Sequence, residues 1–179
     1  GCPVEVPLDP EPERPRGLGR LCDELAGSDA RAVVLTGYEG FFCAGLDLVN
    51  LFPLARAEMG AFIRGFDAAM LRLWEVPLPV VAAINGHAIA GGAVLVACAD
   101  RRIMAKEGGR IGVTELLVGV PFPALAFEIV RFAVPPRRLS EFTLSGATYT
   151  SDEAVQRGWV DEIAEPGELL DDAIAVAQE

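Results

Sequence analysis

The sequence has few basic residues and almost no histidine, and both shortages narrow what the protein can do. Fifteen lysines and arginines stand against 26 aspartates and glutamates, which gives a formal net charge of −11, and there is a single histidine. An acidic chain repels nucleic acid and anionic membrane surfaces, so we expect neither as a partner. One histidine among dispersed carboxylates offers no metal-ligand spacing, so no metal site is expected. The G-x-S-x-G elbow, the G-x-G-x-x-G fingerprint and a P-loop lysine are also missing, which disfavours a serine hydrolase, a dinucleotide-binding enzyme and a phosphotransferase.

The cysteines lack the spacing of a disulfide or zinc framework. The four of them, Cys2, Cys22, Cys43 and Cys98, include no C-x-x-C pair, which favours free or buried thiols in a reducing compartment. No signal-peptide pattern opens the chain, so we expect a cytoplasmic protein. With 179 residues, 51% of them hydrophobic, the chain is predicted to form one domain over 1–179, with a proline-rich, partly irregular segment at 1–17.

One uncharged run bears on the expectation of a single folded domain, because it could instead be a membrane span. Val76 to Ala99 contains 24 residues without a formal charge, long enough to span a bilayer. Two prolines and a group of glycines interrupt it, which favours a strand, a turn and a buried helix over a membrane span.

Hydrophobic periodicity predicts alternating strands and helices, typical of an α/β fold with covered sheets. The expected strands are Val4–Leu8, Ala32–Thr36, Val80–Ile84, Arg101–Ala105, Arg110–Val113 and Trp159–Ile163. The expected helices are Leu18–Ala26, Leu51–Trp74, Gly91–Cys98 and Pro121–Phe132, with three more opening near Ser140, Ser151 and Gly167. No repeat of fixed period is visible in the sequence.

Two glycine-rich turns are the most informative feature. Phe42–Asp47 and Asn85–Gly92 each follow an apolar strand-like run and lead into a helix-like one. A strand that ends in small residues at a helix start leaves backbone N–H groups free. Two such turns brought together would hold one negatively charged oxygen between two amides, which predicts an oxyanion hole.

On these residues the chain resembles the crotonase family, the enoyl-CoA hydratase/isomerase group of acyl-CoA enzymes. The segments that carry the resemblance are Arg31–Gly37, Phe42–Leu48, Pro79–Gly92, Ala99–Ala105 and Ile111–Gly119, with weaker matches at Leu144–Gly146 and Ala154–Val160. The resemblance implies a single-domain spiral of ββα turns, with N-terminal strands shortened to roughly Val4–Leu8. It also implies that the chain ends at Glu179 before the helices that close the acyl pocket in relatives.

The resemblance also implies the site. The amides of Ala44 and Gly91 would hold the thioester oxygen of an acyl-CoA, and Ala44, Gly45, Leu46 and Asp47 would line the CoA-binding strip. Glu115 would be the catalytic acid–base. Coenzyme A is part of the substrate, so no separate cofactor is implied. A homotrimer or a pair of trimers would be the assembly.

One departure from the hydratase pattern bears on the reaction. Hydratases of this family use two glutamates, and the first position is occupied here by Val94. Hydration benefits from two carboxylates, whereas moving a double bond from C3 to C2 needs one group that takes a proton from C2 and returns it at C4. The sequence therefore favours Δ3,Δ2-enoyl-CoA isomerisation by Glu115. Two alternatives remain: a hydratase whose water is held by backbone groups or a displaced acid, and a non-catalytic member that binds an acyl-CoA or a partner.

The other polar candidates can also be explained by structural roles. Asp47 is as well suited to capping a helix as to touching a ligand. His87 is expected to be a packed turn residue rather than a general base, since no nucleophile motif accompanies it. Glu107, Glu128 and Asp100 are expected to be solvated or capping carboxylates. Arg56 and Arg64 are candidates for meeting the CoA phosphates.

Overall fold

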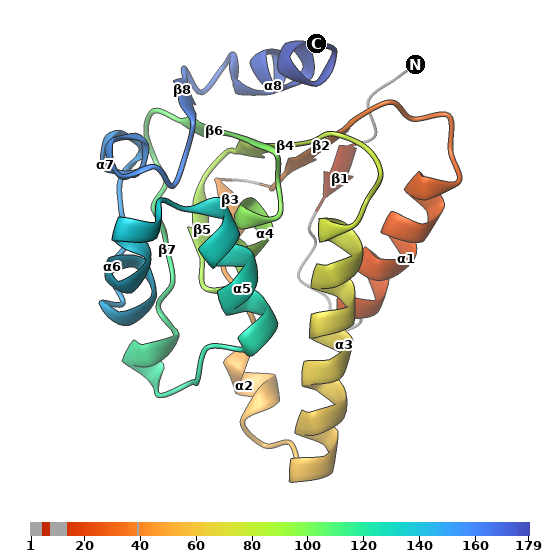
Figure 1. Ribbon diagram of the computed structural model, residues 1–179, viewed down its shortest axis with the longest axis vertical. Helices are drawn as coiled ribbons and strands as arrows, with labels where there is room; N and C mark the ends of the chain where they lie inside the picture. The colour runs from red at the N-terminus through yellow and green to blue at the C-terminus, as the bar shows by residue number, and fades with distance from the viewer. Residues whose placement is uncertain (1–4, 8–13, 39) are drawn as a thin grey trace.

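A computed structural model describes residues 5–7, 14–38 and 40–179 (Figure 1). Its strands are β1 (Glu5–Pro7), β2 (Val33–Thr36), β3 (Phe41–Cys43), β4 (Val80–Ile84), β5 (His87–Ile89), β6 (Arg101–Ala105), β7 (Ile111–Gly112) and β8 (Glu162–Ala164). Its α-helices are α1 (Arg14–Ala26), α2 (Leu48–Leu51), α3 (Arg56–Trp74), α4 (Gly91–Ala97), α5 (Ala124–Ala133), α6 (Leu139–Leu144), α7 (Ser151–Arg157) and α8 (Leu169–Ala177). Two 3₁₀ turns, η1 (Glu115–Val118) and η2 (Pro136–Arg138), join them.

The strands form two parallel sheets, and the chain alternates between them. One sheet has the order β1-β2-β4-β6-β8 and the other the order β3-β5-β7. Three successive ββα units result, each with one strand in each sheet: β2-β3-α3, β4-β5-α4 and β6-β7-α5. This is the spiral of ββα turns implied by the family resemblance, and it confirms the α/β fold. The repeat lies in the backbone, since the sequence has no matching period.

Both faces of the five-stranded sheet are covered. Alternate residues of β2 point in opposite directions, so that Val33 and Leu35 join the main core while Val34 joins a second, smaller one. The smaller core lies under α8, which contributes Leu169 and Ala173. Strands buried on both sides have continuous apolar sequences, and that is why β2 and β4 were predicted well.

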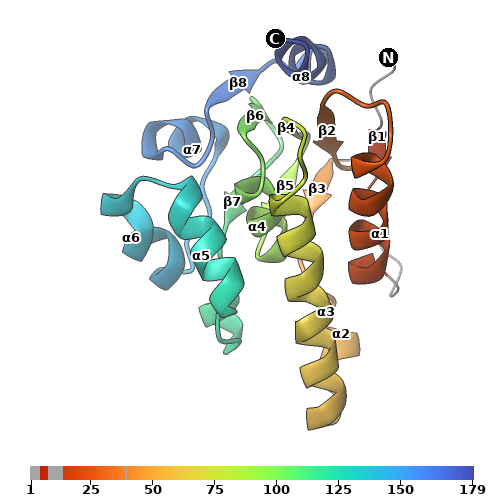
Figure 2. The ribbon, with the colours of Figure 1, turned by 45° about the vertical axis from the view of Figure 1, so that its right-hand side comes forward.

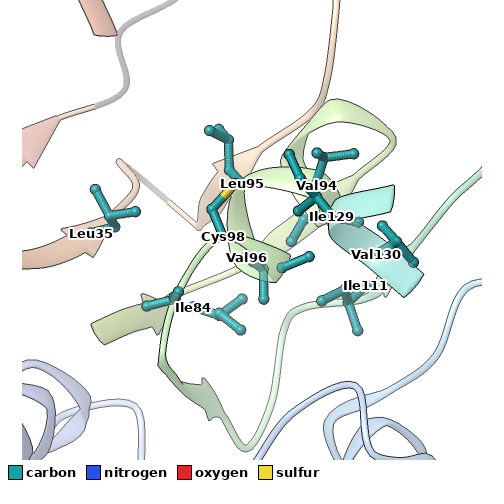
Figure 3. Packing of buried hydrophobic residues seen from close by; sticks show 14 of the residues in the cluster. Leu35, Ile84, Val94, Leu95, Val96, Cys98, Ile111, Ile129 and Val130 are labelled. Carbon is teal, nitrogen blue, oxygen red and sulfur yellow. The ribbon is translucent and has the colours of Figure 1, made fainter. Parts of the chain in front are cut away.

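The main core lies between the two sheets and the helices α1, α3, α4 and α5. Figures 1 and 2 show α3 standing between α1 and α5, with the short helix α4 behind them. All seven residues of α4 are buried. In Figure 3, Val94 of α4 lies beside Ile129 and Val130 of α5, while Leu95 and Cys98 point to another side. A helix that is apolar all round is expected at such a central place.

The uncharged run Val76–Ala99 is divided among β4, β5 and α4, as its punctuation predicted. Within the part of the chain that the structure describes, no helix is long and apolar enough to cross a membrane.

Several boundaries differ from the expectation. The helix predicted over Leu51–Trp74 is interrupted between α2 and α3, because Pro53 lacks the N–H that a continuous helix needs. After this break α3 starts at Arg56, with Ala55 as its N-cap, and the Ala55 amide donates to the Glu58 side chain at 2.8 Å. The irregular segment predicted for 1–17 contains the start of α1, where Pro15 is tolerated in the first turn. Val4 and Leu8, the expected ends of the first strand, lie outside the described residues.

Later boundaries shift for similar reasons. The helix predicted from Pro121 begins at Ala124, because Pro121 and Pro123 keep the entry extended. The last strand, predicted over Trp159–Ile163, is β8 at Glu162–Ala164. Trp159 is instead a core residue with 0% exposure, 4.9 Å from the ring of Phe142 between centroids.

Candidate active site

The candidate site lies where three neighbouring parallel strands end. In the three-stranded sheet β5 pairs with β3 on one side and with β7 on the other, all running in the same direction. Ala44 directly follows β3, and Gly91 follows β5 with one residue between them. Glu115 is the first residue of η1, shortly after β7. Carboxyl ends of parallel strands meet at one edge of a sheet, where ligands commonly bind. The fold therefore brings the three residues proposed for chemistry to the same edge.

The two glycine-rich turns touch each other, and glycine makes the contact possible. A Cβ on Gly92 would lie 2.1 Å from the carbonyl oxygen of Cys43, which no side chain can tolerate. Gly45 has φ +92°, and a Cβ there would lie 2.9 Å from the carbonyl oxygen of Ile89. A Cβ on Gly91, in contrast, would meet Gly45 Cα at an ordinary 3.7 Å. Gly45 and Gly92 thus set the close approach of the two turns, and Gly91 does not.

Ala90 has the only positive φ, +55°, among the described non-glycine residues. Such a conformation costs free energy for any L-residue with a side chain and persists only where neighbours hold it. Its amide donates to the Gly112 carbonyl at 2.9 Å, and its own carbonyl accepts from the amides of Ala93 and Val94 at 2.9 and 3.2 Å. β7 and α4 therefore hold the backbone that presents the next amide, that of Gly91.

The amides of Ala44 and Gly91 are available as donors. None of the hydrogen bonds found among the described residues uses either of them. Gly91 is buried at the first position of α4, where no intrahelical acceptor exists, and Ala44 is exposed beside it in the facing turn. The arrangement suits an anionic oxygen that two backbone amides would bind.

Glu115 is the buried carboxylate at this edge. Its exposure is 9%, and its Oε2 is buried without a hydrogen-bond partner among the described residues. Burial raises the pKa of this carboxyl, and hydrogen bonds from the backbone amides of Glu115 and Thr114 oppose the rise. A carboxyl whose pKa is raised by burial is suited to taking a proton and giving it back.

The residues next to the candidate site have structural roles. Asp47 caps α2: its Oδ1 accepts from the amides of Val49 and Asn50 at 3.0 and 3.4 Å, and its Oδ2 accepts from Asn50 Nδ2 at 2.7 Å. Leu46 lies close to the turns, with its Cγ 3.9 Å from the Cβ position of Gly91. Val94 is 1% exposed and belongs to the core, so nothing polar stands where hydratases of the family carry their first glutamate.

None of the other acidic candidates lies at this edge. Asp100 is beyond the opposite end of α4, where its Oδ2 accepts from the Val80 amide at 2.8 Å. Glu128 is exposed and pairs with Arg131. Glu107 is exposed in the turn after β6. The fold does not deliver any of them as the missing second acid.

The remaining candidates are also placed. His87 is half-buried in β5 with its ring 5.3 Å from that of Phe41. Arg56 and Arg64 are exposed on the N-terminal half of α3. Over the described residues, no group of three or more histidine, cysteine, aspartate or glutamate side chains gathers into a metal site.

Two residues of α3 were not singled out from the sequence. Phe66 has its Cε2 3.8 Å from the Cβ position of Gly91, so it packs directly against the second turn. Asp67 is a lone carboxylate within the apolar stretch Phe66–Leu71. Its Oδ1 is buried without a hydrogen-bond partner among the described residues, and burial raises the pKa of its carboxyl.

A cavity of about 410 Å³ lies elsewhere. It lies at the carboxyl ends of α3, α4 and α5, lined by Trp74, Ala97, Cys98, Ala99, Asp100, Arg102, Phe132 and Ala133. Its polar side chains are already satisfied: Arg102 bonds Asp161 and the Ala133 carbonyl, and Asp100 bonds the Val80 amide. It offers space without unpaired polar groups, and we do not assign chemistry to it.

Comparison with known proteins shows the family of the chain. The family model described as enoyl-CoA hydratase/isomerase matches residues 23–179. A Thermus thermophilus protein with an enoyl-CoA hydratase name is 37% identical over 94% of this chain and 67% of its own length. The (E)-benzylidenesuccinyl-CoA hydratase of Thauera aromatica is 29% identical over 84% of this chain and 58% of its own length. The chain thus spans between about half and two thirds of the curated relatives it matches.

Solved structures show the same fold. The enoyl-CoA hydratase from Bacillus anthracis superposes with a TM-score of 0.88 at 26% identity, covering 98% of this chain and 71% of that one. The enoyl-CoA hydratase of Mycobacterium smegmatis gives a TM-score of 0.87 at 26% identity, over 98% and 71% of the two chains.

Proposed function

Because the chain belongs to the enoyl-CoA hydratase/isomerase family, we propose that it acts on an acyl-CoA thioester by way of an enolate. The thioester oxygen would accept hydrogen bonds from the amides of Ala44 and Gly91. Charge that develops on this oxygen is stabilised by donors already in position, an effect worth ~10²–10³ in rate for one donor. Gly45 and Leu46 would line the CoA strip, and Asp47 would support it by capping α2.

The reaction favoured by the site is Δ3,Δ2-enoyl-CoA isomerisation. The Glu115 carboxylate takes a proton from C2, and the C–H electron pair moves into the thioester to give a dienolate. The resulting carboxylic acid then returns the proton to C4, the double bond settles between C2 and C3, and the thioester carbonyl is restored. No proton, electron or other atom is gained or lost overall, so one carboxyl suffices.

The observation that carries this proposal is Glu115 itself. A buried carboxylate oxygen without a partner is costly, by ~1–3 kcal/mol for an unsatisfied polar group, and is retained where a ligand or a reaction uses it. Its place beside the two turns gives it a carbon acid to act on. Val94 supports the single-carboxyl reaction, because a valine neither binds nor activates water.

Two further aspects rest on the family resemblance. We propose that coenzyme A, as part of the substrate, is the only coenzyme involved. We also propose a homotrimer or a pair of trimers in the cytoplasm, which sedimentation equilibrium of the purified protein would test.

The test is to offer 3-enoyl-CoA and 2-enoyl-CoA separately to the wild type and to Glu115→Gln. Turnover of 3-enoyl-CoA is expected in the wild type and should fall by about 10²–10⁴-fold in the variant, the usual contribution of a general acid–base. Binding of acyl-CoA should persist, because the amides are untouched. An unchanged rate in the variant would exclude the proton-shuttle role, and acyl-CoA binding without any turnover would indicate a binding protein instead.

A further inference from the structure

Gly112 of β7 is connected to both groups that have a role in the proposed reaction. Its carbonyl oxygen accepts a hydrogen bond from the amide of Ala90 at 2.9 Å, and Ala90 directly precedes Gly91. Three residues after Gly112 the chain reaches Glu115, the first residue of η1. A displacement of β7 would therefore disturb the Gly91 amide and the Glu115 carboxyl alike.

The outer edge of β7 is held by a segment from a later part of the chain. β7 has two residues and is the last strand in the order β3-β5-β7, so the sheet pairs it on one side only. Its other side is covered by residues 146–149, which follow α6 and are called the 146–149 segment below. Ile111 and Tyr149 form an antiparallel bridge there, with backbone hydrogen bonds from the Ile111 amide at 3.0 Å and from the Tyr149 amide at 2.8 Å.

Two glycines bring this segment close to the chain on either side of Glu115. A Cβ on Gly112 would lie 2.3 Å from the carbonyl oxygen of Ala147. A Cβ on Gly146, where φ is +67°, would lie 2.5 Å from Cγ of Leu117, which follows Glu115 by two residues. The segment therefore contacts the chain both before and after the carboxylate.

The side chain of Arg110 joins β7 to the same segment. Its Nε donates to Thr148 Oγ1 at 2.8 Å, and its Nη2 donates to the Thr148 carbonyl. Tyr149 is fixed in turn to α6 and α7, since its ring lies 5.4 Å from that of Phe142 and 5.0 Å from the guanidinium of Arg157. In Figures 1 and 2, β7 lies between β5 on one side and α6 and α7 on the other.

The proposed reaction requires a fixed separation between the carboxyl and the amide. The carboxyl has to reach C2 and then C4 while the thioester oxygen stays on the amides, and a misplacement of about 1 Å can cost about 10²-fold in rate. We propose that the 146–149 segment is a positioning element of the active site, in which the contact of Arg110 with Thr148 sets the place of Glu115 relative to the Gly91 amide. This inference rests on the proposed function, because it gives the segment a role toward those two groups. Arg110 and Thr148 are positioning residues that act through β7.

The test removes the contact and measures both rate and position. Arg110→Met keeps most of the length of the side chain and removes both hydrogen bonds to Thr148. We expect kcat on 3-enoyl-CoA to fall by about 10-fold or more with little change in KM. The amide resonance of Gly91 and the carboxyl carbon resonance of Glu115 should shift in NMR spectra of the labelled protein. Thr148→Val should give a smaller change of the same kind, and Thr148→Ser, which retains the acceptor oxygen, should give wild-type values.

Arg101→Met is the matched control. The Arg101 side chain is 47% exposed, close to the 43% of Arg110, and it bonds Glu162 of β8 rather than a residue near the site. This variant should leave kcat and both resonances unchanged.

Each outcome supports or overturns the proposal. Resonances of Gly91 and Glu115 at their wild-type positions in a folded Arg110→Met protein overturn it, whatever the rate. Equal losses of kcat in Arg110→Met and Arg101→Met also overturn it, because the effect would then be one of stability. If Arg110→Met does not fold, Thr148→Val and Thr148→Ser carry the same comparison. Failure of the proposed function is distinguishable, since Glu115→Gln reports it and the two resonances report positioning without any turnover.

Discussion

The two ends of α4 differ in what their polar groups are doing. At its amino end, two glycine-rich turns press together, two amides have no acceptor among the described residues, and Glu115 has a buried oxygen without a partner. At its carboxyl end, about 10 Å away along the seven-residue helix, lies the 410 Å³ cavity. Every charged side chain that lines this cavity already has a hydrogen-bond partner.

In this protein, polar groups without hydrogen-bond partners therefore indicate the site of chemistry better than the volume of a cavity does. A large cavity with satisfied polar groups gives a charged intermediate nothing to bind. Two free donors and a desolvated carboxyl can stabilise such an intermediate, because these groups act strongly where water is excluded. Changes at the amino end should therefore affect rate, and changes at the carboxyl end should affect stability.

After Glu115→Gln, the largest effect is expected from Gly92→Ala. The added Cβ would lie 2.1 Å from the Cys43 carbonyl oxygen, so the turns must separate and the two amides can no longer bind one oxygen together. Turnover should fall by ~10²–10³, the usual cost of losing an oxyanion donor, when measured as kcat on 3-enoyl-CoA.

Gly91→Ala is the matched control one residue earlier. Its Cβ has ordinary contacts of 3.7–3.9 Å with Gly45, Phe66 and Leu46, so the approach of the turns should survive and the rate should be little changed. Equal losses in the two variants would mean that the contact between the turns does not matter for the reaction.

The next effect is expected at the other end of the helix. Arg102, whose side chain is 12% exposed, makes two hydrogen bonds to Asp161 and one to the Ala133 carbonyl. Arg102→Ala should lower the free energy of unfolding by about 1.5–3 kcal/mol, as for a hydrogen-bonded charged group, without changing kcat. Urea unfolding measures the first and turnover the second, and a reduced kcat in a folded Arg102→Ala protein would contradict the division between the two ends.

A pH series sharpens the role of Glu115. Its pKa is raised by burial, so the folded protein favours the protonated form, and the associated stability is present at low pH and is lost as pH rises through the raised pKa. Glu115→Gln should therefore be as stable as the wild type in acid and more stable at neutral pH, measured by chemical denaturation. The wild-type rate should show the opposite trend and fall on acidification, because the base must be ionised. A variant less stable than the wild type at pH 7 would indicate that the carboxylate stabilises the fold.

The smallest effect is expected from Phe132→Ala. Phe132 is 75% exposed, and its edge-on contact with Trp74 is worth ~0.5–1.5 kcal/mol. The loss should appear as a slightly lower denaturation midpoint with no change in rate. A fall in turnover would assign a functional role to the carboxyl-end cavity after all.

The predictable parts of the fold were those buried on both sides. β4 occurs at the predicted residues because a parallel strand between two layers is a continuous apolar run, and the buried part of β6, Ile103–Ala105, is apolar in the same way. β3 and β5 were read as parts of turns, since three residues that include Phe41 or His87 carry too little periodicity to be recognised. Of the second sheet, which defines the site, only β7 was therefore predicted, within the strand expected at Arg110–Val113.

The candidate site was predictable as far as its motifs are local. The two glycine-rich turns and Glu115 stand in short segments, and their meeting at one sheet edge follows once the strands are known to be parallel. The buried Oδ1 of Asp67 could not be predicted in this way, because its lack of a partner among the described residues depends on how α3 packs against other helices. Asp47 shows the opposite case, a residue whose capping role was visible from its place before α2.

The most direct measurement is a crystal structure of the protein with an acyl-CoA bound. We expect the thioester oxygen to lie within hydrogen-bond distance of the amides of Ala44 and Gly91, with C2 facing the Glu115 carboxyl. A thioester seated in the cavity beside Trp74 and Asp100, or one turned away from those two amides, would contradict it.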